Sequence, residues 1–96
     1  MSLFTGEKLP IKFVDVAVDP ASITNATSAE TDVTVPGVTT RDMVIANVPA
    51  SLETGLVFSG VRVKSDNTLA LRLSCIAAAP VDGASRTWRF GIIKTL

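Results

Sequence analysis

The 96-residue sequence contains no histidine and no tyrosine, and it has one cysteine, Cys75. Without histidine, a serine or cysteine nucleophile would need a lysine or a carboxylate as its general base, and no motif suggests such a pair. A lone cysteine excludes an intrachain disulfide, and no Cys/His cluster has the spacing that holds zinc. Neither a glycine-rich phosphate loop nor a calcium-binding loop occurs. We therefore expect a protein that is not an enzyme and that uses no cofactor or metal.

Net charge is absent as well, because nine acidic residues balance nine basic ones, and the basic residues are spread along the chain. A chain without a basic patch does not attract nucleic acid or an anionic membrane by charge. No run approaches the roughly 20 apolar residues that cross a membrane, and the first residues lack the pattern of a secretory signal. We expect synthesis in the cytoplasm, no nucleic-acid or membrane partner, and a tolerance of dense assembly.

The sequence does have apolar and polar residues that alternate with a period of two, which is typical of β-strands. The clearest case is residues 68–76, where Leu69, Leu71, Leu73 and Cys75 share one face. Residues 42–48 are apolar on both faces, which predicts a strand covered on both sides. The other predicted strands include residues 12–18, 30–35, 61–64 and 87–92.

Turn residues separate these segments. Pro36-Gly37 predicts a type II turn, and residues 65–67 predict a hairpin loop. Gly60, inside a strand pattern, predicts a bulge or a close backbone approach. Short strands about a dozen residues apart predict an all-β fold, a small antiparallel β-sandwich or jelly-roll-like barrel of about six to eight short strands.

The first eleven residues follow no regular pattern. We interpret residues 1–11 as an extended N-terminal arm and residues 12–96 as a single β-sandwich domain. The arm carries Leu3 and Phe4, an apolar pair that suits an anchor ordering on a partner. The alternative is a frayed terminus, which is common at chain ends. Leu3 and Phe4 are therefore candidate interface residues.

A few other side chains could carry chemistry or binding. Cys75 shares its face with three leucines, which predicts a buried core thiol. Trp88 and Phe90 share a face, which favours core packing over an exposed platform for sugars or bases. Arg86 and Arg89 flank Trp88, and arginine is enriched at protein interfaces, so both are candidate interface residues. The carboxylates of the strands and strand ends are expected to face solvent: Asp15, Glu30, Asp32 and Asp42.

The turn and strand patterns of residues 18–92 resemble those of small structural proteins of tailed bacteriophages that decorate or cement the head shell. The segments that carry the resemblance are 19–23, 29–35, 42–45 with Pro49, 56–63, 68–73 and 81–90. The sequence departs from the pattern at Gly83, where proline is expected, and at Arg41-Asp42, where glycine is expected before the acid. Both departures affect turns only.

This resemblance implies a β-sandwich or jelly-roll subunit, commonly trimeric, bound to the outside of a phage head. Its expected partners are further copies of itself and the major capsid protein, and its expected location is the virion head surface. The resemblance transfers no catalytic residues. Two alternatives stay open: another virion component, such as a neck, tail or fibre part, and a small carbohydrate-binding β-sandwich module that uses Trp88.

Overall fold

A computed structural model describes residues 11–94, and within this range the chain forms β-strands and no helix. The strands are β1 (Ile11–Val18), β2 (Ser28–Thr34), β3 (Met43–Asn47), β4 (Leu56–Ser65), β5 (Thr68–Cys75) and β6 (Arg86–Ile93). The all-β prediction is confirmed for these residues, and each predicted strand overlaps one of the six. β1 already includes Ile11, so the predicted arm, apart from that residue, lies outside the described residues.

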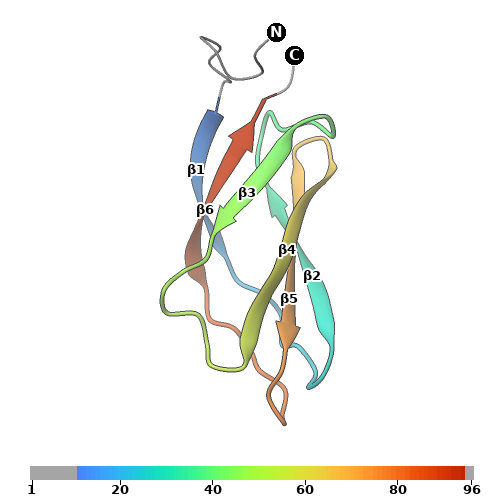
Figure 1. Cartoon of the computed structure of the whole chain (residues 1–96), viewed down its shortest axis with the longest axis vertical. Coiled ribbons are helices and arrows are strands. Elements are labelled where there is room, and N and C mark those ends of the chain that lie inside the picture. The colour runs from blue at the N-terminus through green and yellow to red at the C-terminus, as the bar shows by residue number, and fades with distance from the viewer. Residues whose placement is uncertain (1–10, 95–96) are drawn as a thin grey trace, which may run out of the picture.

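The six strands form two three-stranded antiparallel sheets that face each other (Figure 1). One sheet has the order β1-β6-β3 and the other the order β2-β5-β4. Only the β4–β5 connection stays within a sheet, whereas every other connection between consecutive strands crosses to the opposite sheet. β3 and β4 lie side by side where the two sheets meet along one edge (Figure 1). The arrangement is that of a small β-sandwich, and the jelly-roll-like barrel stays a prediction.

The core lies between the two central strands, β5 and β6. Leu69, Leu71 and Leu73 of β5 face inward and are fully buried, as are Trp88 and Phe90 of β6. The rings of Trp88 and Phe90 stack with their centroids 6.3 Å apart. Because side chains alternate along a strand, the residues between these apolar ones point to the outer face of each sheet.

The predicted turns are present. Val38 donates its backbone N–H to the carbonyl of Val35 at 3.4 Å and closes the turn at Pro36-Gly37. Gly37 has a φ of 92°, the positive value that a type II turn requires at its second central residue. The two-residue loop Asp66-Asn67 joins β4 to β5, and the β4–β5 register shifts next to Gly60, which confirms the predicted bulge.

The expectation that residues 42–48 are covered on both faces is wrong. β3 is the edge strand of its sheet and pairs only with β6. Val44 and Ala46 pack against the core, whereas Met43 and Ile45 are 62% and 55% exposed on the outer face. In β3, the inner face packs against the core, and the outer face is also apolar but is left uncovered.

The expectation that Asp42 faces solvent is also wrong. Its side chain is 1% exposed and accepts a 2.7 Å hydrogen bond from the Lys94 ammonium. It also accepts the backbone N–H of Thr39 at 2.9 Å. A buried carboxylate of this kind is compensated by a cation and a backbone donor, so it fixes the turn before β3.

Candidate binding face

The outer face of the β1-β6-β3 sheet exposes a group of large apolar side chains. Strand register arranges them in rows, because Ile11 and Met43 flank Ile93, and Phe13 and Ile45 flank Gly91. We call this group the apolar face; its members are Ile11, Phe13, Met43, Ile45 and Ile93. Ile11, Phe13, Met43 and Ile45 are 50–65% exposed and Ile93 is partly buried, so the face leaves apolar area in water that could be removed on binding.

A hollow in the apolar face borders Gly91. Phe13, which is 65% exposed, and Ile45 stand on either side of Gly91, one on each neighbouring strand. A Cβ atom at Gly91 would lie 2.9 Å from Cγ1 of Ile45 and 3.2 Å from Cε1 of Phe13, so these two side chains pack over the glycine. The hollow beside them, which Asn47 and Arg89 also line, has a volume of about 310 Å³. It is large enough to receive one side chain of a partner.

An ion pair borders the apolar face. Arg89 of β6 lies opposite Asp15 of β1, and its Nε donates to the carboxylate of Asp15 at 2.9 Å. This hydrogen bond holds the pKa of Asp15 below its ordinary value. The candidate interface residue Arg89 is therefore exposed beside the hollow, with its charge balanced by a neighbour on the same face.

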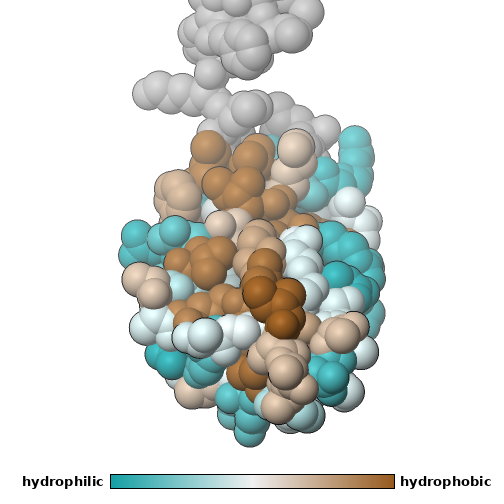
Figure 2. Space-filling view, turned by 60° about the horizontal axis from the view of Figure 1, so that its bottom comes forward, coloured by the Kyte–Doolittle hydropathy of each residue, from teal (hydrophilic) through white to brown (hydrophobic). Residues whose placement is uncertain are grey.

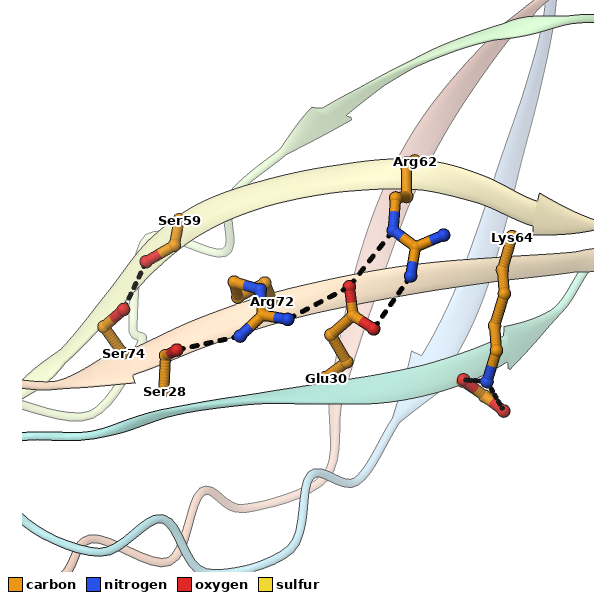
Figure 3. Close-up of polar contacts among 8 residues, drawn as sticks. Ser28, Glu30, Ser59, Arg62, Lys64, Arg72 and Ser74 are labelled. Carbon is orange, nitrogen blue, oxygen red and sulfur yellow. Dashed lines mark hydrogen bonds and ion pairs between the residues drawn. The ribbon is translucent and has the colours of Figure 1, made fainter.

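The outer face of the other sheet is different, because its charged side chains bind one another (Figure 3). Arg62 of β4 donates from Nε and Nη2 to the two carboxylate oxygens of Glu30 at 3.2 and 3.0 Å. Arg72 of β5 lies 3.4 Å from the same carboxylate, between the two other strands. The remaining contacts of this ladder are Arg72 to Ser28, Lys64 to Asp32, and Ser59 with Ser74.

The two outer faces thus have opposite character. In the space-filling view, which shows one side of the molecule, hydrophobic side chains gather in the upper and central parts. Hydrophilic side chains lie along the right flank and also at the left margin and the bottom (Figure 2). Exposed ion pairs contribute about 0–1 kcal/mol each, so the ladder adds little to stability. Its donors and acceptors are already paired, and burying them against a partner would require desolvation of several charges. The apolar face is the better binding surface.

Arg86 has a role inside the domain. It donates from Nη2 and Nε to the carboxylate of Glu53 at 3.0 and 3.1 Å, and from Nη1 to Ser51. Together with the backbone N–H of Ala84, these hydrogen bonds lower the pKa of Glu53 to about 2. Arg86 therefore ties the β3–β4 loop to the start of β6. Its candidate role at an interface would compete with these internal bonds.

The other sequence candidates are placed as follows. Trp88 is 1% exposed and also contacts the ring of Phe58, so the core-packing prediction is confirmed and Trp88 offers no stacking platform. Cys75 is buried, as predicted. Leu3 and Phe4 lie outside the described residues. Between residues 11 and 94, no group of three or more His, Cys, Asp or Glu side chains is arranged to hold a metal ion.

The sequence interpretation missed the apolar face itself. Its signal was present in two strands that are apolar on both sides, residues 11–18 and 43–47. Phe13 and Ile45 do not lie close in sequence, and only the pairing of both strands with β6 brings them together. Sequence alternation alone gives no information on which strands share a sheet.

No protein-family model matches the chain, and no curated protein or solved structure shows significant similarity to it. The described part of the chain contains no helix long and apolar enough to span a membrane. Function is therefore argued from the geometry of the two sheet faces.

Proposed function

We propose that the chain is a non-enzymatic structural protein of a virion, a decoration or cement protein that binds the outside of a phage head and bridges capsid subunits. The observation that carries this proposal is the contrast between an exposed apolar face and a charged face whose ions pair internally. A protein with this contrast has one side suited to a protein partner and one suited to water.

A cement protein needs contacts that form only on the assembled shell. A ligand that binds only the assembled state stabilises that state by mass action. The apolar face offers such contacts without an active site, and the hollow at Gly91 offers a fixed position for one partner side chain. Repetition of the contact over many copies on a lattice raises the avidity far above that of one contact.

Self-association and a terminal anchor complete the proposal. A domain of this size has a modest core and gains stability by covering an apolar face. The resemblance implies a trimer as the oligomer. Residues 1–10 would act as the second attachment point, with Leu3 and Phe4 buried against the shell. Deletion of residues 1–9 tests this part, because the domain should stay folded while its attachment weakens.

The experiment on the apolar face compares two substitutions of the same type. Ile45→Ser removes an exposed apolar side chain from the apolar face, whereas Ile76→Ser removes one that follows β5 and is 72% exposed. Purified variants are added to phage heads that lack the protein, and occupancy is measured after sedimentation. Loss of one buried Ile costs about 1.5–3 kcal/mol of binding, which lowers the affinity about tenfold or more. Ile76→Ser should bind like the parent.

Equal occupancy for both variants would contradict the role of the apolar face. If the parent chain fails to bind heads but is found in necks, tails or fibres, the protein belongs to another layer of the virion. A carbohydrate-binding role through Trp88 has no support in the geometry, because Trp88 is buried.

A further inference from the structure

The four edge strands of the sandwich are protected to different degrees. An exposed strand edge offers unpaired backbone groups to any other strand, and proteins usually block it with charges, bulges or short length. β2 carries Glu30 and Asp32, and β4 carries a bulge at Gly60 together with Arg62 and Lys64. β3 has only five residues and lies beside β4. Each of these three edges has a protecting feature.

β1 carries two charged residues of opposite sign, but it has no bulge and is not short. It is eight residues long, pairs only with β6, and contains no proline, glycine or bulge. Its charged residues are Lys12 and Asp15, and Asp15 is bound to Arg89. Over the described residues, no strand pairs with its outer edge. A long, regular and apolar edge of this kind is a template for another strand.

A groove adjoins the open edge. It lies between β1 and the turn that follows β2, and its volume is about 560 Å³. Val14 and Val16 of β1 face it and are only half-buried, although they point toward the core side of their sheet. Val35 and Val38 line its other wall. The sandwich is thus closed where β3 meets β4 and open between β1 and β2.

We propose that β1 pairs with β1 of a second copy of this chain, antiparallel about a two-fold axis, to form a continuous six-stranded sheet. A two-fold axis normal to the sheet pairs an edge strand with itself and keeps both outer faces on the same side. Residues on one face then lie opposite residues of the same face. Which residues lie opposite each other across this contact therefore depends only on the sequence of β1 and on its register.

Charge and length select one register. With Val14 on the axis, residues 11–17 all pair: Ile11 lies opposite Ala17, Lys12 opposite Val16 and Phe13 opposite Asp15. No like charges meet in this register. With residue 15 on the axis, Asp15 would lie opposite Asp15 of the second copy, which is destabilising. With residue 13 on the axis, only residues 11–15 of β1 would pair. We therefore place Val14 on the axis.

The pairing also explains the size of the apolar face. Five partly exposed side chains provide on the order of 400 Å² of apolar surface in one copy, about half of what one partner contributes to a standard protein interface. Two copies joined through β1 present two apolar faces on the same side of one sheet, and together they reach the standard size. The second copy's Val14 would in addition lie over the mouth of the groove.

Cysteine substitution tests the register. In an antiparallel pair, directly opposite residues have Cα atoms about 4.5–5.5 Å apart, within the range of a disulfide. Val14→Cys should thus form a disulfide-linked dimer under mild oxidation. Val16→Cys is the matched control, because it lies on the same strand and face but about 14 Å from its counterpart in this register. The native Cys75 is buried and should not react.

The expected result is a dimer of the parent chain by light scattering, in place of the trimer that the resemblance implies. Val14→Cys should be linked at least about tenfold faster than Val16→Cys. Hydrogen exchange of the β1 amides should also slow as the protein concentration rises. A monomer at tens of micromolar, a trimer whose β1 amides exchange at the same rate at every concentration, or equal linking of both variants would overturn the proposal. These outcomes do not depend on capsid binding, so they leave the proposed function to its own test.

Discussion

At the residue scale, the most deeply buried side chains are those whose removal should destabilise the domain most. Trp88 and Phe90 on β6 meet Leu69, Leu71 and Leu73 on β5, and all five are at most 1% exposed. Each was assigned to a core face from alternation alone. Burial of a large aromatic ring accounts for much of the stability of a small domain, because few other side chains remove as much area from water.

Substitution of Trp88 should therefore unfold or nearly unfold the domain. Trp88→Ala is expected to lower the free energy of unfolding by about 3–5 kcal/mol, because it leaves a cavity beside Phe58 and Phe90. Trp88→Phe should cost less, since an aromatic ring still fills most of the site. Urea denaturation measures both, and the parent's fluorescence should be blue-shifted and poorly quenched by acrylamide. A Trp88→Ala domain as stable as the parent would contradict the packing described.

Some local features of the fold could be predicted from short sequence patterns, and others could not. The turn at Pro36-Gly37 and the bulge at Gly60 were predicted correctly, because both depend on the backbone preferences of one or two residues. The burial of Asp42 was not predicted, because it depends on Lys94, 52 positions away in the sequence. Backbone preferences can be recognised in short segments of the sequence. Compensation of a buried charge, in contrast, depends on the tertiary fold.

At the scale of elements, the strands were predictable and their partners were not. Alternation located most strands to within two residues but found only residues 61–64 of β4, and it could not assign β1, β6 and β3 to one sheet. For this reason β3 was interpreted as covered twice, although Met43 and Ile45 are exposed. The apolar face is a property of three strands in register, so no single segment reveals it.

The ion pair between Glu53 of the β3–β4 loop and Arg86 of β6 gives a prediction of how stability depends on pH. The ordinary pKa of Glu53 is 4.5, and hydrogen bonds from Arg86 and Ala84 lower it to about 2 in the folded domain. A lowered folded pKa means that Glu53 stabilises the fold above pH 4.5 and that this contribution is lost as the pH falls from 4.5 toward 2. Glu53→Gln should thus melt below the parent at pH 6, and the difference should shrink toward pH 2.

Thermal unfolding followed by circular dichroism between pH 2 and 7 measures this difference. Asp15 and Glu30 also have lowered pKa values, but they titrate in both proteins and cancel in the comparison. A melting difference between parent and Glu53→Gln that stays constant from pH 6 to pH 2 would show that the ion pair with Arg86 does not stabilise the fold.

At the scale of the whole molecule, the sandwich has two outer faces that suit different surroundings. The ladder on β2, β5 and β4 consists of charged groups paired with each other, whereas the face of β1, β6 and β3 is apolar around the hollow at Gly91. A domain with this asymmetry has a preferred orientation on any surface that it binds. On the proposed phage head, we therefore expect the β1-β6-β3 sheet to face the capsid.

Electron microscopy of intact particles tests this claim most directly. We expect density for the domain on the outside of the head, with the β1-β6-β3 sheet turned toward the capsid and the Glu30–Arg62 ladder turned toward solvent. Density for the domain in the neck, tail or fibres would contradict the proposed location. Density on the head with the ladder against the capsid would contradict the role of the apolar face.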